Sequence, residues 1–284
     1  MLTFNQEQLI YWVNERENIR KNKEAGLSAP WSNNPVMQET YFCNVNREDD
    51  KVTKWIRQNW TYPNDILGYE CSKYYDFAMI VARIFNLPDT LEIIKQPVEI
   101  YHWLENAKGK LTDNKESGKK IWNGAYIIST NGKKIDKLTH CFNLFEKIAR
   151  NPNITGNCKT LEEAHTELTK VDGLASFLAA QVVADLKNTK GHPLQDADDW
   201  WLFSSYGPGS LRGLTWFFEE TITPKNYHEK INEAYDILEF ELPEEILDIL
   251  CMQNLQNCFC EYDKFMRVTE GTGKSKRKYN GKGN

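Results

Sequence analysis

Apolar side chains recur every three or four residues along most of this chain, the spacing of one face of an α-helix. Leu9, Trp12 and Val13 mark a first amphipathic helix near the amino terminus. The same spacing predicts further helices: a short one beginning near Asp49 and Asp50, and others over residues 74–85, 89–106, 135–150 and 176–186. We therefore expect a mainly α fold.

Prolines, caps and polar clusters set the expected ends of these helices. Pro97 should kink or split the helix over 89–106, because proline lacks a backbone donor and clashes with the preceding turn. The other expected boundaries are a capping box at Thr160–Glu163, helix starts at Thr223-Pro224 and Leu242-Pro243, a charged loop over 108–120, and one strand or extended piece over 125–130.

Length and composition limit the class of protein. The chain has 284 residues, of which 40% are hydrophobic and 12% aromatic, enough for a packed core. There is no membrane-length apolar run and no signal-peptide pattern at the start. Seven cysteines without regular spacing favour reduced thiols in the cytoplasm, and no zinc-ligand spacing is present. We expect no metal bound by the protein.

Charge is distributed unevenly along the chain. Residues 264–284 have a formal charge of +6, which leaves −11 for residues 1–263. We interpret 1–263 as one mostly helical domain, undivided or in two lobes, and 264–284 as a basic, glycine-rich tail. Such a tail suits DNA phosphates or is simply a solvated terminus. Its candidate DNA contacts are Lys274, Lys276, Arg277 and Lys278. Gly271–Ser275 is no phosphate-binding P-loop, since Val268 replaces the required glycine.

The densest chemistry lies between Asp198 and Leu214. Ser210 stands where it would cap a helix after Gly207-Pro208-Gly209, and a helix start beside glycines is a natural seat for an anion. Arg212 would add a bidentate donor to that seat, and Asp199 a base or a charge. An ordinary loop-to-helix junction with an aspartate cap explains the pattern equally well.

Two further segments are rich in polar chemistry. In Tyr41–Ile56, Asn44, Arg47 and Glu48 stand between apolar anchors, and a helical turn would bring Arg47 and Asp50 onto one face. A solvated helix start is the alternative interpretation. The segment 257–265 carries Glu261, Asp263 and Lys264 and is a weak signal by itself.

A helix–turn–helix pattern surrounds Gly173. Helix-hairpin-helix glycosylases use such a turn to bind a DNA phosphate and an aspartate downstream to face the base, which here would be Asp199. An ordinary αα-hairpin is at least as compatible with the sequence, because Asp172 and Ala175 replace two residues of the usual hairpin.

Taken together these segments resemble a known family. The segments resemble, in order, the blocks of the α-glutamyl/putrescinyl-thymine pyrophosphorylases: Phe42–Thr53, Trp122–Ile128, Gly173–Gln181, Asp199–Gly213 and Cys260–Lys264. The same module is known as the helical domain of 5-hydroxymethyluracil DNA kinases, from phage DNA hypermodification. The resemblance covers nearly the whole chain. It implies a helical fold distantly related to helix-hairpin-helix glycosylases, in the cytoplasm of the host cell.

The resemblance also implies a reaction. An amino acid or polyamine would displace pyrophosphate from a pyrophosphorylated 5-hydroxymethyluracil base in double-stranded DNA, and a 5-hydroxymethyluracil DNA kinase is an implied partner. Arg47, Arg212 and the Gly207–Ser210 turn would bind the leaving group, and Asp199 or Glu48 would act as the base. Asn44 and Gln181 would read the uracil edge. Asp263 and Lys264 are the remaining implied substrate contacts, and Mg²⁺ would enter only with pyrophosphate.

Two other functions fit the same residues. The chain would be a DNA-binding helical subunit of a kinase if it binds modified DNA without turning it over. It would be a glycosylase if Asp199 supported cleavage of a modified base. The mass of the product nucleoside separates the enzymes, because a glycosylase leaves an abasic site and a transferase leaves a heavier base.

Overall fold

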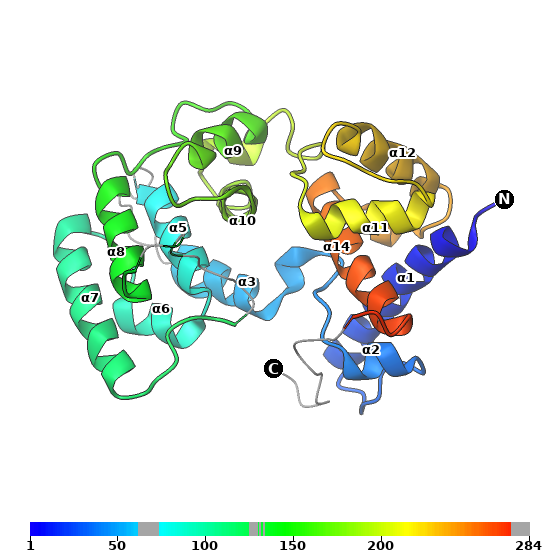
Figure 1. The fold of residues 1–284 in the computed structure, drawn as a ribbon, viewed down its shortest axis with the longest axis horizontal. Helices are drawn as coiled ribbons and strands as arrows, with labels where there is room; N and C mark the ends of the chain where they lie inside the picture. Colours follow the sequence, from blue (N-terminus) through cyan, green and yellow to red (C-terminus); the bar gives the residue numbers. More distant parts are fainter. Residues whose placement is uncertain (62–73, 125–129, 131, 133, 274–284) are drawn as a thin grey trace. The chain divides into compact units, whose positions relative to one another are not determined.

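The computed structural model describes residues 1–61, 74–124, 130, 132 and 134–273, and these residues form helices and connecting segments without a β-strand (Figure 1). The predicted mainly α fold is confirmed. The expected strand over 125–130 lies almost wholly outside the described residues, as do the four basic tail residues proposed to contact DNA. The chain divides into two compact units, residues 1–51 with 201–284, and residues 52–200.

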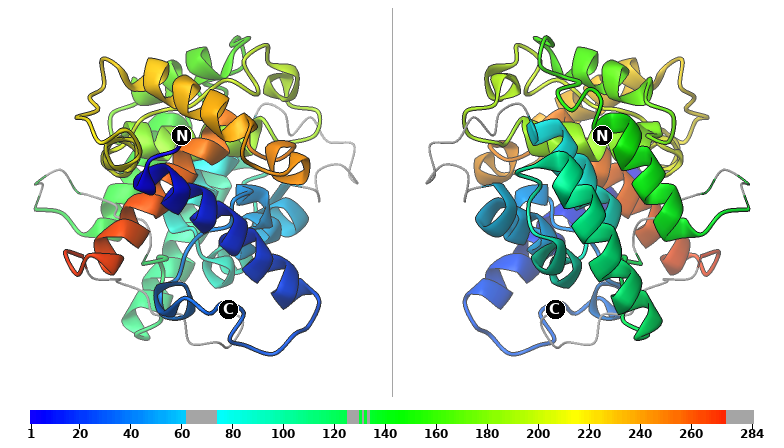
Figure 2. Two further views of the ribbon diagram at one scale, coloured as in Figure 1. Left: turned by 90° about the vertical axis from the view of Figure 1, so that its right-hand side faces the viewer. Right: turned by 90° about the vertical axis from the view of Figure 1, so that its left-hand side faces the viewer.

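Unit 1 combines the two ends of the chain. Its helices are α1 (Phe4–Glu24), α2 (Pro35–Glu39), the 3₁₀ turn η1 (Arg47–Asp49), α11 (Pro208–Phe218), α12 (Tyr227–Glu239), α13 (Glu244–Leu247) and α14 (Met252–Thr269). The long helix α14 is the centre of this unit, because α1, α2, α11 and α12 all pack on it. Figure 2 shows α1 (blue) next to α14 (orange to red).

Helix α14 buries one face in an apolar core. Leu255, Phe259, Tyr262 and Phe265 are at most 1% exposed and pack with Leu9 and other residues of α1, α11 and α12. Burial of this many apolar side chains is the main source of stability of the unit.

Helices α11 and α14 approach closely because α11 carries glycine at the contact. A Cβ atom placed on Gly213 would lie 2.1 Å from the carbonyl oxygen of Phe259, and one on Gly209 would lie 2.3 Å from the sulfur of Cys260. Neither position has room for a larger side chain. Gly209, which we expected to approach a ligand, thus serves helix packing in this structure.

Unit 2 is a second helical assembly. Its elements are α3 (Lys51–Ile56, of which Lys51 is counted with unit 1), the π-helical turn η2 (Arg57–Thr61), α5 (Tyr75–Phe85), α6 (Pro88–Ile94), α7 (Ile100–Glu116), α8 (Lys137–Ile148), α9 (Leu161–Thr169), α10 (Ser176–Leu186) and the 3₁₀ turn η4 (Pro193–Asp196). Aromatic rings of Phe77, Trp103, Phe142 and Phe145 pack edge-to-face or stacked in its core. Figure 2 shows α7 and α8 side by side.

A buried charge cluster joins three elements of unit 2. Asp185 of α10 accepts hydrogen bonds from Arg57 at 2.9 Å and from Arg83 of α5 at 2.6 Å, and its side chain is 0% exposed. Burial raises the pKa of Asp185, but the two guanidinium groups outweigh burial and hold that pKa below its usual value. The carboxylate therefore stays ionised and ties η2, α5 and α10 together.

Several predicted boundaries are confirmed. The helix expected over 89–106 is split at Pro97 into α6 and α7, and the capping box of Thr160 and Glu163 opens α9. Two expectations are wrong. The stretch 108–120 is not a loop, because α7 continues to Glu116 on the buried residues Ala107 and Leu111. Thr223-Pro224 does not begin a helix, since α12 starts at Tyr227.

Candidate functional site

A polar face of α14 contacts the segment 41–50 within unit 1. This face consists of Asn254, Asn257, Glu261 and Lys264, which are spaced three or four residues apart and so lie along one side of the helix. Lys264 Nζ donates to the carbonyl oxygen of Tyr41 at 3.0 Å and to Glu261 at 2.5 Å. Lys264, expected in the tail, is therefore part of a helix, and its ammonium group binds protein atoms.

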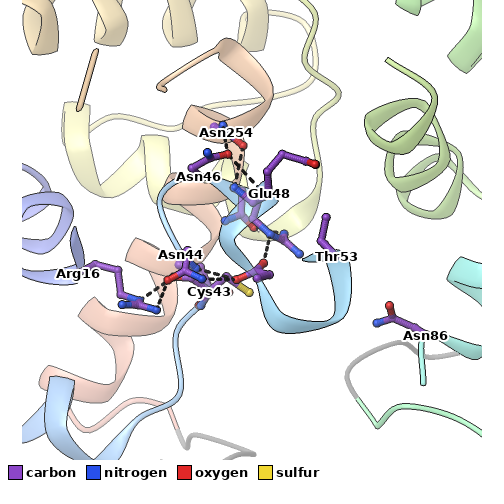
Figure 3. A network of polar contacts seen from close by, with 12 residues as sticks. Arg16, Cys43, Asn44, Asn46, Glu48, Thr53, Asn86 and Asn254 are labelled. Carbon is purple, nitrogen blue, oxygen red and sulfur yellow. Dashed lines mark hydrogen bonds and ion pairs between the residues drawn. The ribbon is translucent and has the colours of Figure 1, made fainter. Parts of the chain in front are cut away.

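Five side chains form a hydrogen-bonded network across this contact. Arg16 of α1 donates to the Asn44 amide oxygen, and the Asn44 amide nitrogen donates to Asp50 at 3.1 Å. Arg47 Nε donates to the other oxygen of Asp50, and Arg47 Nη1 donates to Asn257 at 2.7 Å. Figure 3 shows Arg16 directed at Asn44, with Asn254 and Asn46 close together above them.

This network orients two of the predicted site residues, Asn44 and Arg47. Asp50 is 7% exposed and binds both Asn44 and Arg47, which confirms the expected pairing of Arg47 with Asp50. The Asn44 amide oxygen accepts from Arg16, and its amide nitrogen donates to Asp50. Asn44 would therefore contact a base through its second N–H or the second lone pair of its oxygen. In the described part of the chain, Arg16 Nη1 and Asn257 Nδ2 are buried without a hydrogen-bond acceptor.

A second arginine is held by a second buried acid. Arg212 of α11 donates from Nε to both oxygens of Asp263, at 3.1 and 3.2 Å, and from Nη2 at 2.8 Å. Asp263 is 1% exposed, whereas the Arg212 side chain is 51% exposed. Hydrogen bonding to Asp263 raises the pKa of Arg212. Its charge is therefore permanent and its position is fixed.

The turn before α11 differs from the prediction in one respect. The helix begins at Pro208, three residues earlier than expected, with Gly207 as its N-cap, in keeping with the preference for proline in the first helical position. Ser210 is not the cap but lies in the first turn, 0% exposed, where its hydroxyl accepts from the Gly207 N–H at 3.0 Å. One backbone donor of the expected anion seat is thus already satisfied.

Asp199 lies in unit 2 at the start of a different helix. Its two carboxylate oxygens accept the backbone N–H groups of Leu161 at 2.7 Å and Glu162 at 3.0 Å, in the first turn of α9. The next residue, Trp200, donates from its indole to the carbonyl of Lys187 at 3.0 Å, and its ring lies under the Lys187 ammonium. Asp199 and Trp200 therefore join the beginning of α9 to the end of α10.

The remaining expected residues also belong to unit 2. Gly173 lies in the turn between α9 and α10 with a φ of +109°, a conformation that favours glycine, and Leu144 packs against it. Gln181 lies in the middle of α10. The structure thus places Asn44, Arg47, Glu48, Arg212, Asp263 and Lys264 in unit 1. Arg47 contacts α14 at Asn257, and Arg212 contacts it at Asp263.

Arg16 is a residue of this network that we did not predict. The helical spacing could have identified it, because Leu9, Trp12 and Val13 define the buried face of α1 and Arg16 continues it three residues after Val13. A charged residue at such a position needs a partner inside the protein.

The described residues contain neither a candidate metal site nor a helix suited to span a membrane. They include no cluster of three or more histidine, cysteine, aspartate or glutamate side chains arranged to hold a metal ion. Among these helices, none has the length and apolar character needed to cross a membrane.

Comparison with known proteins gives the family. A family model described as the helical domain of 5-hmdU DNA kinase matches residues 4–275. The chain belongs to this family. A 5-hmdU DNA kinase of Bacillus phage SP10 is 27% identical over 231 residues, which cover 74% of this chain and 36% of the phage protein. This member of the helical-domain family thus matches about a third of that kinase, and no solved structure matches the chain.

Proposed function

We propose that this chain modifies thymine-derived bases in phage DNA by displacing pyrophosphate from a pyrophosphorylated 5-hydroxymethyluracil with an amine. The amine nitrogen attacks the methylene carbon attached to the base. The carbon–oxygen bond breaks, and pyrophosphate leaves with the electron pair. The nitrogen gives up one proton to a base, and the product carries a new carbon–nitrogen bond.

The observation that carries this proposal is the way two arginines are positioned. Arg47 and Arg212 are each held by a buried carboxylate, Asp50 and Asp263 respectively. Cations fixed before the reaction stabilise charge that develops on a leaving group without a cost of reorganisation. Pyrophosphate is such a leaving group, and any Mg²⁺ would be carried by its oxygen atoms.

Glu48 is the base we favour. It lies on η1 next to Arg47, in the unit that holds both arginines. Asp199 is the weaker candidate, because both of its oxygens already accept backbone hydrogen bonds. We keep Asn44 and Gln181 as proposed contacts to the uracil edge, and Gly173 with the basic tail as proposed contacts to DNA.

Nucleoside mass spectrometry tests the reaction. A duplex carrying pyrophosphorylated 5-hydroxymethyluracil is incubated with the protein and a pool of amino acids and polyamines, then digested. We expect a new, heavier nucleoside with the wild type, a loss of at least a hundredfold in its rate with Glu48→Gln, and no loss with Glu39→Gln, an exposed glutamate of α2. An unchanged nucleoside profile with folded protein contradicts the proposal.

A second candidate function is recognition of modified DNA on behalf of a kinase. It is favoured by one observation, that the matching relative is a 5-hmdU DNA kinase and the matching family is its helical domain. A recognition module would bind 5-hydroxymethyluracil duplexes more tightly than thymine duplexes, equally well with or without Glu48→Gln, and would form no new nucleoside.

A further inference from the structure

Asp263 binds a second arginine besides Arg212. Arg267, one turn further along α14, donates from Nε to Asp263 Oδ2 at 3.1 Å, and the same oxygen accepts from Arg212 Nη2 at 2.8 Å. The two guanidinium groups therefore meet at one oxygen atom. Arg212 comes from α11 and Arg267 from α14, so their spacing is set by the close packing of these helices at Gly209 and Gly213.

This cluster has an excess of positive charge. Two permanently charged guanidinium groups share one carboxylate, which leaves a formal charge of +1 among the three groups. Asp263 is 1% exposed, whereas the side chains of Arg212 and Arg267 are 51% and 37% exposed. The acid is therefore inside the protein and the two cations face solvent.

The guanidinium groups also keep unused donors. Asp263 engages Nε and Nη2 of Arg212 and Nε of Arg267. The other terminal N–H groups of the pair make no hydrogen bond to the part of the chain that is described. Paired guanidinium groups with free, planar N–H donors match the geometry of phosphoryl oxygens better than ammonium groups do.

We propose that Arg212 and Arg267, fixed by Asp263, form a binding site for a phosphoryl oxyanion. That the oxyanion is the pyrophosphoryl group of the modified base rests on the proposed function. Arg267 is then a substrate-binding residue, and Asp263 a positioning residue that aligns both guanidinium groups. A phosphate of the DNA backbone has the same chemistry and is the other source to be distinguished.

Binding measurements on the full chain test this site. Inorganic pyrophosphate is titrated into the wild type, Arg267→Gln, Arg267→Lys and Arg150→Gln, and each protein is also titrated with an unmodified duplex. Arg150, an exposed arginine just after α8, provides the matched loss of one positive charge. Circular dichroism of each variant verifies that the fold is retained.

We expect Arg267→Gln to weaken pyrophosphate binding at least tenfold, Arg267→Lys to weaken it less, and Arg150→Gln to change it less than threefold. A loss confined to the unmodified duplex would assign the site to the DNA backbone instead. Equal affinities of Arg267→Gln and the wild type for both probes would overturn the site. Because these titrations need no turnover, they separate its failure from failure of the transferase.

Discussion

At the scale of single residues, carboxylates organise this protein. In unit 1 the buried Asp50 binds Arg47 and the buried Asp263 binds Arg212 and Arg267, and in unit 2 the buried Asp185 binds two arginines. The half-buried Asp199 accepts the first N–H groups of α9. The sequence drew attention to Arg47, Arg212 and Asp199 because they stand in dense polar motifs. It did not reveal that Asp263 is the partner of Arg212, because these two residues are 51 positions apart in the sequence and meet only through the packing of α11 on α14.

Asp199→Asn should weaken the start of α9. An anionic group accepting two N–H groups in the first turn of a helix stabilises it by about 0.3–1 kcal/mol, and the neutral amide loses most of that. Denaturant unfolding would measure the change, and amide hydrogen exchange at Leu161 and Glu162 would locate it. The control is Asp198→Asn, since Asp198 is exposed. Unchanged exchange at both amides would count against this cap.

At the scale of elements, α14 has two faces with different tasks. One face is apolar and packs in the core, and the other presents Asn254, Asn257, Glu261 and Lys264 to the segment 41–50. Hydrophobic spacing was sufficient to predict most helices, and the chemistry of Pro97 predicted the division between α6 and α7. Hydrophobic spacing was not sufficient for 108–120, because this stretch is rich in charged residues and α7 is buried there only at Leu111, one turn after Ala107. Hydrophobic spacing also cannot identify which two helices pack together.

Gly213→Ala should destabilise the contact between α11 and α14. The added carbon would lie 2.1 Å from a backbone oxygen, which cannot rotate away as a side chain does, so the helices must separate. We expect a loss of about 1–3 kcal/mol in the free energy of unfolding. The control is Gly109→Ala in α7, where the new methyl meets nothing and should add up to about 1 kcal/mol. A stabilised Gly213→Ala protein would show that this contact is looser than described.

Asp185→Asn should alter both stability and its dependence on pH. The folded-state pKa of Asp185 lies below the ordinary value of 3.8, so its contribution is present above about pH 4 and lost as pH falls through the folded-state pKa. Neutralising it deprives two buried arginines of a shared acceptor, with an expected cost of about 3–5 kcal/mol at pH 7.

Denaturant unfolding of wild type and variant between pH 7 and pH 3 measures this effect, and the difference between them should shrink at the acid end. Asp172→Asn removes an exposed ion pair with Lys147 and should cost less than about 1 kcal/mol. Equal losses from both variants would mean that burial of Asp185 has no energetic consequence.

At the scale of the whole molecule, the chain is organised as one unit inserted into another. Residues 52–200 separate the two segments of unit 1, whose core unites α1 with α11, α12 and α14. No linker or change in composition marks either boundary, which is why we expected a single domain over 1–263, undivided or in two lobes. Helix α14 also continues to Thr269, past the expected start of the tail.

A fragment of residues 52–200 should fold without the rest of the chain. Its aromatic core and the Asp185 cluster lie entirely within it. A fragment of residues 1–51 should remain unfolded, because Leu9, Trp12 and Val13 have lost the helices that cover them. Amide dispersion in NMR spectra and cooperative thermal unfolding measure both outcomes. A disordered 52–200 fragment would contradict the division into two units.

The hydrogen-bonded network that includes Asn44 and Asn257 has a consequence for synthesis of the protein. A ribosome adding about 5–20 residues per second needs roughly 10–40 s to pass from one asparagine to the other. During that interval unit 2 emerges and can fold. Arg16, Asn44 and Arg47 have then been synthesised, but α14, which supplies Asn257, has not. An incompletely translated chain that lacks α14 therefore cannot assemble the candidate site.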